Sequence, residues 1–406
     1  MTSVPSTPSS QQPPQIAVLS AKEWLQKNLF NTWYNTLITL GISALLLFML
    51  TRFISWAFTL AKWSVIPANL PLFFVGRFPG DQYWRLWVML GIISVLSGIT
   101  WGFLARNSRL LFSKNILVIL GFVGILAVIT PVPIIFRFLL IGMLLLLVAG
   151  AWGGKIIGNT YPKLGKWLPF SWFLLLIICI WFIGGGLGLK VVQTNLWGGL
   201  MLTLLMSIVS ILLSFPIGIL LALGRQSSLP IIRILSTIYI EIIRGLPLIT
   251  ILFMGQVLLP LFLPEGSRPD RILRAIIGLT MFSSAYLAEN IRGGLQAIPR
   301  GQTEAAKALG LNTPLTVSLI ILPQALKVSI PSIVGQFISL FQDTTLLSIV
   351  GLVELLGMSR SILANPKFLG RYLEVYLFIG ILYWVFCYAM SVASQKLEKE
   401  LNTEHR

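Results

Sequence analysis

Residues 198–222 read GGLMLTLLMSIVSILLSFPIGILLA and contain no charged side chain. A helix of about 20 apolar residues crosses the roughly 30 Å hydrocarbon core of a bilayer, so this stretch predicts a membrane-spanning helix. Apolar runs of this kind recur along the chain, and we expect ten spans in all. Their approximate limits are 35–60, 86–104, 115–131, 133–152, 168–188, 198–222, 237–262, 272–290, 328–351 and 374–394.

The overall composition supports the same conclusion. The chain has 406 residues, of which 56% are hydrophobic and only 11% are charged, whereas soluble domains carry about 25% charged residues. Because backbone polar groups inside lipid must bond within the same segment, spans of this length are helices. We therefore predict an all-α polytopic membrane protein of about ten transmembrane helices.

The charge of the chain is strongly basic, with a formal net charge of +17. A nucleic-acid-binding protein is one interpretation of such a charge, but here the lysines and arginines lie in short loops between apolar runs. The loops after the second, fourth, sixth and eighth runs are basic, which favours a cytoplasmic position for them and for both termini. Arg77, Arg271 and Arg360 lie in the opposite loops, so the charge pattern favours this orientation without fixing it.

The domain organisation follows from the apolar runs. Residues 1–34 are expected to form a disordered cytoplasmic tail and lead-in, and residues 35–190 an amino-terminal membrane extension of five helices. Residues 191–395 carry the other five spans, with a long loop at 291–327, and 396–406 form a cytoplasmic tail. Pro131 and Pro133 mark either a tight turn or a re-entrant kink.

Side chains suited to catalysis or metal binding are scarce in the sequence. Cys179 and Cys387 lie inside apolar runs and His405 is next to last, so we predict no metal site and no catalytic group. The chain also has no phosphate-binding loop, because the Gly-Lys pair at Gly154-Lys155 is followed by Ile156 instead of Ser or Thr. Any ATP must be bound and hydrolysed by another subunit, and the chain itself is predicted to hold no cofactor.

The loop at 291–327 contains the start and stop signals of two short helices that meet at a corner. Pro299 is suited to open the first helix and Gly310 to end it. Thr313-Pro314 provides an N-cap followed by proline, and Pro323 marks the end of the second helix or the bend into the next span. The corner is either a docking knob for a partner protein or an amphipathic connector on the bilayer surface.

The residues of the first short helix suit a docking surface. Ala305 and Ala306 are small, so a groove of the partner comes close to the backbone there, and Glu304 offers a carboxylate to a cation of the partner.

The loop matches a family pattern position by position. Glu304-Ala-Ala, Gly310, Ile320 and Leu322-Pro323 resemble the signature of the permease subunits of binding-protein-dependent ABC importers. The resemblance implies a type I ABC importer permease core in the carboxy-terminal five spans and a coupling helix that sits in a cleft of an ATPase. It assigns ATPase coupling to Glu304, Ala305, Ala306, Leu309, Gly310 and Pro323.

Further motifs narrow the subfamily. The stretches 239–248 (YIEIIRGLPL), 285–289 (AYLAE), 298–302 (IPRGQ) and 342–346 (QDTTL) look like polar amino-acid permeases of the histidine and glutamine type. The added amino-terminal half, with 28–37 (NLFNTWYNTL), is similar to the longer permeases for general L-amino acids.

The subfamily resemblance implies an amino-acid importer of the bacterial inner membrane that works by alternating access. It implies three kinds of partner: an ABC ATPase dimer, a second permease subunit, and a periplasmic amino-acid-binding protein. The second permease is either identical or different, and the resemblance favours a different chain.

A path for amino acids requires groups that bind an ammonium and a carboxylate, and ionisable groups inside a membrane are usually functional. The candidates are Asp343, Gln336, Gln342 and Glu289, with a structural capping role for Asp343 as the alternative. Glu241 and Arg244, three residues apart, are expected to pair on one helix face. An ion-gradient-driven secondary transporter or channel is the alternative function, and it predicts an ion-coordinating cluster that the sequence does not contain.

Overall fold

The computed structural model describes residues 20–130, 132–264 and 266–403. Their regular structure consists of helices, with only isolated backbone bridges between extended residues. The chain divides into two compact units, Met1–Lys62 and Trp63–Arg406. Eight of the described helical segments are long and apolar enough to cross a membrane, or nine if one bent pair forms a single span. The predicted all-α polytopic fold is confirmed, with eight or nine spans of full length.

In the first unit, residues 20–62 form two α-helices and a π-helical segment. α1 (Ala21–Asn28) begins at a capping box, in which the Ser20 hydroxyl accepts from the Glu23 amide and the Glu23 carboxylate accepts from the Ser20 amide. α2 (Trp33–Ser55) continues as a π-helix (Trp56–Leu60), and none of its residues is buried. Of the predicted tail, residues 1–19 lie outside the described residues, whereas 21–28 are helical.

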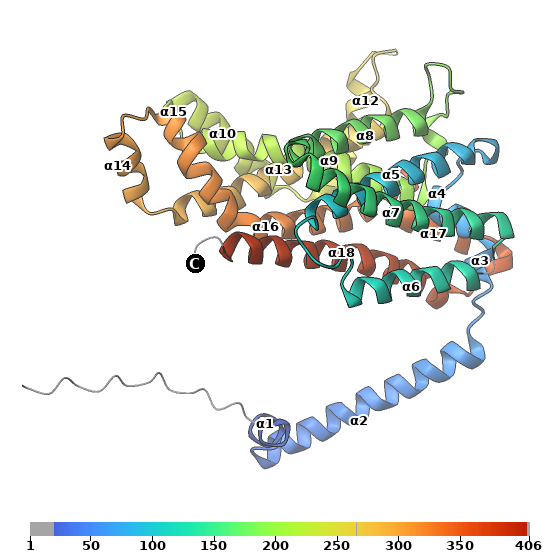
Figure 1. Ribbon diagram of the computed structural model, residues 1–406. Coiled ribbons are helices and arrows are strands. Elements are labelled where there is room, and N and C mark those ends of the chain that lie inside the picture. Colours follow the sequence, from blue (N-terminus) through green and yellow to red (C-terminus); the bar gives the residue numbers. More distant parts are fainter. Residues whose placement is uncertain (1–19, 131, 265, 404–406) are drawn as a thin grey trace, which may run out of the picture. The chain divides into compact units, whose positions relative to one another are not determined.

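The second unit holds the remaining full-length spans (Figure 1). They are α5 (Tyr83–Leu104), α7 (Ile134–Thr160), α8 (Leu168–Gly184), α9 (Gly199–Arg225), α13 (Arg271–Ala297), α16 (Leu322–Asp343) and α18 (Tyr372–Thr403). α18 extends through residues 396–403, although the sequence predicted a tail there. Short helices precede or join these spans: α3 (Val65–Ala68), α4 (Leu70–Val75) and α17 (Leu355–Leu363).

Two of the ten expected spans differ from the prediction. The third is α6 (Lys114–Ile129), whose 16 residues rise only about 24 Å, less than the thickness of the hydrocarbon core. The seventh is broken into α10 (Pro230–Gly245) and the run Leu248–Phe262, which meet at 101°. Leu246 is extended and Pro247 starts the new direction, because the residue before a proline avoids the helical region. Pro133 is the N-cap of α7, and Pro131 lies outside the described residues.

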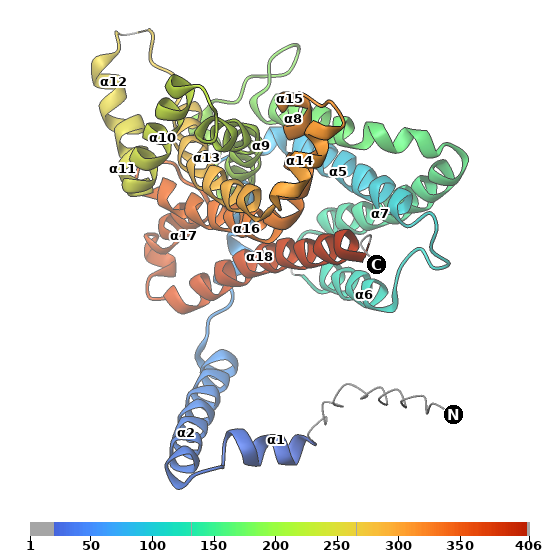
Figure 2. The same cartoon turned by 90° about the vertical axis from the view of Figure 1, so that its left-hand side faces the viewer.

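The centre of the second unit is α13, which packs along both α9 and α16. Leu279, Leu287 and Ile291 of α13 are fully buried there. α5 packs on α7 and α8, and α18 packs on α16 and α17. Figure 2 looks onto the end of this unit at which the chain between α13 and α16 turns back.

Candidate functional site

The loop between α13 and α16 folds into a short capped helix, α14 (Arg300–Ala308). Pro299 is its N-cap, one position before the first helical residue that the sequence predicted it to be. At the other end Gly310 has a φ of +79°, and its amide donates to the Lys307 carbonyl while the Leu311 amide donates to the Ala306 carbonyl. These two bonds form a Schellman motif, which needs a left-handed residue at the position of Gly310. The first half of the loop is therefore held by its own backbone.

The second half of the loop begins one residue earlier than expected. The N-cap of α15 (Thr313–Leu315) is Asn312, whose side-chain oxygen accepts from the Leu315 amide at 3.0 Å. The predicted cap, Thr313, is instead the first helical residue. α15 runs without interruption through a π-helical segment, Thr316–Ile321, into α16, where Pro323 occupies the first turn. The prediction that Pro323 ends the second short helix is therefore wrong, because a proline in the first turn of a helix needs no backbone donor. We call residues 300–321 the elbow.

Most of the predicted coupling residues lie on the outside of the elbow. Glu304, Ala305 and Gly310 are exposed, and the Leu309 side chain is 82% exposed although it is apolar. Ala306 is different: it is 3% exposed because it faces the protein itself. The expectation that both alanines are open to a partner is therefore wrong for Ala306.

A cluster of charged side chains joins α9, α10 and α13. The Glu289 carboxylate accepts from the Arg292 guanidinium, whose Nε lies at 3.0 Å, and pairs with Arg225 at 3.3 Å and Arg244 at 3.7 Å. Arg225 also pairs with Glu241 at 2.8 Å. The predicted pair between Glu241 and Arg244 is thus wrong, because each finds its partner on another helix.

This cluster combines three arginines with two glutamates, so it keeps an excess of positive charge. Three of its four ion pairs join different helices: Arg225 of α9 pairs with Glu241 of α10 and with Glu289 of α13, and Arg244 of α10 pairs with Glu289. The fourth pair, Arg292 with Glu289, lies within α13. The carboxylate of Glu289 is already surrounded by guanidinium groups, which makes it a poor acceptor for the ammonium of a substrate.

The other predicted path residues lie on α16. Gln336 and Asp343 are seven residues apart and therefore project from nearly the same face of the helix. Gln342 points elsewhere, since its amide donates to the Cys387 sulfur of α18 at 3.6 Å. Asp343 is the last residue of α16, so it lies near the end of the span.

The four predicted path residues do not converge. Asn290, next to Glu289, donates to the Ser332 carbonyl of α16 at 3.2 Å. Asp343 is eleven residues further along α16, which corresponds to about 16 Å. Gln336 and Asp343 form one group, and Glu289 belongs to the arginine cluster.

Glu354 is a buried carboxylate that was not among the predicted site residues. Glu354 is fully buried between the spans and caps α17, where it accepts from the Leu356 and Gly357 amides at 2.8 Å each. The Tyr383 hydroxyl donates to it at 3.1 Å. Burial raises the pKa of the Glu354 carboxyl from its ordinary value of 4.5 to about 7. Its place before an apolar helix was the available signal, because acidic residues favour helix N-termini.

Among the described residues, no group of three or more histidine, cysteine or acidic side chains is arranged to hold a metal ion.

Comparison with known proteins gives consistent matches. The family model described as "Binding-protein-dependent transport system inner membrane component" matches residues 214–403. The "Inner membrane amino-acid ABC transporter permease protein YhdY" of Escherichia coli (strain K12) is 37% identical over 94% of both chains. The "Glutamate/glutamine/aspartate/asparagine transport system permease protein BztC" of Rhodobacter capsulatus is 35% identical over 97% of both chains.

A shorter relative matches only part of the chain. The "Probable glutamine ABC transporter permease protein GlnP" of Bacillus subtilis is 36% identical over 50% of this chain and 92% of its own. The first two relatives, by contrast, align with the amino-terminal half as well. The resemblance that the sequence motifs indicated is confirmed, and the chain belongs to the family of amino-acid ABC transporter permeases, the inner-membrane components of binding-protein-dependent transport systems.

Proposed function

We propose that this chain is a permease subunit of an ATP-driven amino-acid importer and that the elbow is the site at which a separate ATPase docks. The observation that carries the proposal is an exposed, capped helix, α14, placed directly between two spans. An exposed apolar side chain such as that of Leu309 is suited to fill a partner's groove, because desolvated anchors dominate binding energy.

The connection to the membrane supports a coupling role. The elbow passes through its π-helical segment straight into α16, and the Gln324 amide of α16 donates to Gln302 of α14 at 3.4 Å. π-Helical turns are often found at functional sites. A displacement of the elbow by the ATPase would therefore be transmitted to the span that carries Gln336 and Asp343.

The same proposal assigns the path and the partners. Asp343 and Gln336 of α16 contact the amino acid as it passes along the path. The arginine cluster holds α9, α10 and α13 together beside this path. A dimer of ABC ATPases binds and hydrolyses the ATP, a second permease subunit completes the path, and a periplasmic binding protein delivers the amino acid. The chain lies in a bacterial inner membrane with both termini in the cytoplasm, and the path opens alternately to the two sides.

The test uses two exposed glycines in the assembled transporter, Gly310 in the elbow and Gly370 in the connection between α17 and α18. Both have a positive φ, and a side chain added at either meets no atom within 4 Å. A non-glycine residue at either position costs about 1–2 kcal/mol in the left-handed region. We expect Gly310→Val to reduce amino-acid uptake and substrate-stimulated ATPase activity at least tenfold, with normal amounts in the membrane, and Gly370→Val, which carries the same backbone strain outside the elbow, to leave both near the wild-type level.

Normal coupled uptake by Gly310→Val would contradict the docking role. An ion-gradient-driven transporter predicts a different outcome, in which uptake into vesicles is abolished by an ionophore and continues without ATP.

A further inference from the structure

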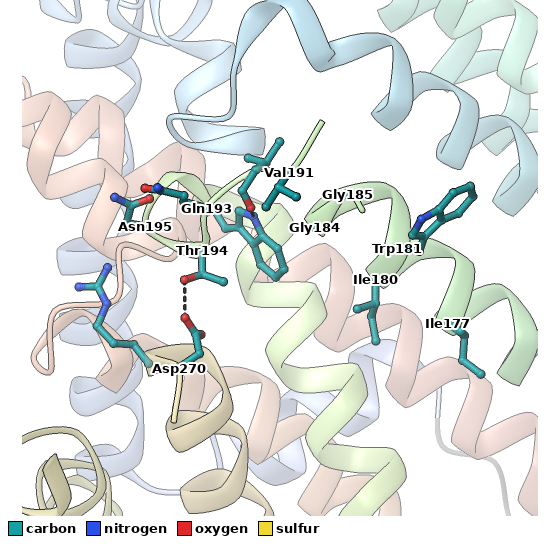
Figure 3. A pocket seen from close by; sticks show the side chains of 13 residues that line it. Ile177, Ile180, Trp181, Gly184, Gly185, Val191, Gln193, Thr194, Asn195 and Asp270 are labelled. Carbon is teal, nitrogen blue, oxygen red and sulfur yellow. Dashed lines mark hydrogen bonds between the residues drawn. The ribbon is translucent and has the colours of Figure 1, made fainter. Parts of the chain in front are cut away.

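A pocket of about 790 Å³ lies where the end of α8, the connection 185–198 and the start of α13 meet (Figure 3). α8 belongs to the amino-terminal half and α13 to the carboxy-terminal half, so both halves contribute walls. The pocket is distant in sequence from the elbow and shares no residue with the arginine cluster or with the proposed path.

The pocket lies at one membrane boundary. α8 ends at Gly184 and α13 begins at Arg271, and both are spans whose ends define where the hydrocarbon stops. Trp181 and Trp197 line the pocket, and tryptophan is enriched at the level of lipid headgroups. The opening therefore faces the headgroup region and the first part of the acyl chains.

One wall of the pocket is apolar and open to lipid. Ile177, Ile180 and Trp181 of α8 line it, with Ile177 and Ile180 50% and 39% exposed. Residues three and four apart lie on one helix face, so the three side chains form a continuous strip. The strip leads from the boundary toward the interior of the bilayer.

The opposite wall is polar and carries both signs of charge. Gln193, Asn195, Asp270 and Arg271 line it, and in the described part of the chain neither amide side chain makes a hydrogen bond. The Asp270 carboxylate accepts from the Thr194 hydroxyl at 2.6 Å, as Figure 3 shows, and from an α13 amide at 2.8 Å. The two bonds go to different oxygens of the carboxylate. Each oxygen therefore keeps a lone pair for another donor.

The walls are held in place without a ligand. The Trp181 indole donates to the Gly186 carbonyl at 2.8 Å, and the Trp197 indole donates to the Val192 carbonyl at 3.1 Å. The Val192 amide in turn donates to the Gly184 carbonyl at 2.9 Å. The connection is thus fastened to α8, and the pocket is preformed.

We propose that this pocket binds a phospholipid whose headgroup carries both a phosphate and a primary amine, as in phosphatidylethanolamine. The phosphate binds Arg271 with the amides of Gln193 and Asn195, the amine donates to Asp270, and one acyl chain follows the apolar strip of α8. The bound lipid bridges the two halves of the permease. An amphipathic occupant is required because a free ion would leave the apolar strip unused.

The first experiment measures the lipid that stays with the protein. The permease, assembled with its partner subunits, is extracted in polymer-bounded discs of native membrane, transferred to mild detergent, and analysed by native mass spectrometry. We expect one phosphatidylethanolamine per chain to be retained by the wild type and by Arg268→Gln, an exposed arginine on the same loop that does not line the pocket. Arg271→Gln is expected to bind about tenfold more weakly, because it loses a charge-assisted bond.

The second experiment distinguishes the sources of the phosphate. Delipidated complex is titrated with phosphatidylethanolamine, phosphatidylglycerol, inorganic phosphate or a free amino acid, and its thermal midpoint is recorded. Only phosphatidylethanolamine is expected to raise the midpoint in a way that depends on Arg271. Gln193→Ala, on the exposed connection, tests the same contact if Arg271→Gln lowers the yield.

Several results would overturn the proposal. Equal lipid retention by Arg271→Gln and Arg268→Gln would remove the phosphate contact, and equal binding of phosphatidylglycerol would remove the role of Asp270. An equal midpoint shift with inorganic phosphate or with a free amino acid would mean a small-molecule site instead of a lipid site.

Discussion

The helix pairs α5–α7 and α9–α13 are both closely packed, but they differ in the share of glycines and hydroxyls at the contact. In α5–α7 glycines bring backbone against backbone: a methyl group on Gly102 would overlap the Ala151 carbonyl, and one on Gly154 would overlap the Ile99 carbonyl. In α9–α13 one glycine, Gly218, comes close to α13, where an added methyl group would lie 2.8 Å from the Leu287 Cβ. Both helices also bury hydroxyls, and those of Ser210, Thr280 and Ser283 have no hydrogen-bond partner.

The difference indicates which interface is built to move. Close glycine packing leaves no space for sliding and favours one arrangement of two membrane helices. An unpaired buried hydroxyl raises the free energy of the conformation that contains it by about 1–3 kcal/mol, so another conformation that pairs it gains that amount. We expect α5–α7 to behave as a rigid pair and α9–α13 to shift during transport.

The largest expected effect tests the rigid pair. Gly153 and Gly154 are neighbours on α7, but only Gly154 faces α5, since a side chain on Gly153 meets no atom within 4 Å. Gly154→Val should lower the free energy of unfolding by about 3 kcal/mol, the upper part of the range for overpacking. Gly153→Val should change it little, as measured from the thermal midpoint of the purified protein. Equal losses in both variants would mean that α7 is not packed through Gly154.

A second prediction concerns the buried carboxylate of the carboxy-terminal half. Burial raises the pKa of the Glu354 carboxyl from 4.5 to about 7. The folded protein therefore holds this proton more tightly than the unfolded chain does. This tighter binding of the proton adds to the free energy of unfolding. The contribution is fully present below pH 4.5 and is lost as the pH rises to about 7, by at most about 1.4 kcal/mol per pH unit. The thermal midpoint should therefore fall between pH 5 and 7.

The matched variant is Glu354→Gln, which has no proton to lose. It should flatten this part of the pH profile, although it also loses one of the oxygens that cap α17. A profile that stays as steep in the variant would assign the pH dependence to other groups.

Local rules predicted much of this structure from sequence. Spans follow from apolar length, because a bilayer admits few alternatives, and the ends of α14 follow from Pro299 and Gly310. The break at Gly245-Leu-Pro247 was also visible, but the apolar residues on both sides made the stretch look continuous. Asn312 and Thr313 are both good caps, and neighbouring caps differ by too little for the sequence to choose.

Long-range partners could not be predicted in the same way. Glu241 has Arg244 nearby on its own helix, yet its partner is Arg225 of α9. The choice depends on how α9, α10 and α13 pack, and one sequence contains no direct record of that packing. For the same reason the sequence placed Glu289 on the path, whereas the structure surrounds it with arginines.

The smallest expected effect tests the mobile interface with two adjacent serines of α13. Both are fully buried, but Ser283 has no hydrogen-bond partner, whereas the Ser284 hydroxyl donates to the Met281 carbonyl at 2.9 Å and lies 3.0 Å from the Tyr239 hydroxyl. Ser283→Ala removes an unpaired group and should stabilise this conformation by about 1 kcal/mol, while Ser284→Ala should destabilise it by a similar amount.

The two thermal midpoints should shift in opposite directions. Since both substitutions remove the same hydroxyl oxygen from the same helix, opposite shifts can only reflect the different hydrogen bonding of the two hydroxyls. If the Ser283 hydroxyl finds a partner in a second conformation, its loss also favours the first conformation, and uptake by Ser283→Ala should slow severalfold despite the higher stability. A destabilised Ser283→Ala with normal uptake would mean that its hydroxyl is already paired and that α9–α13 is as fixed as α5–α7.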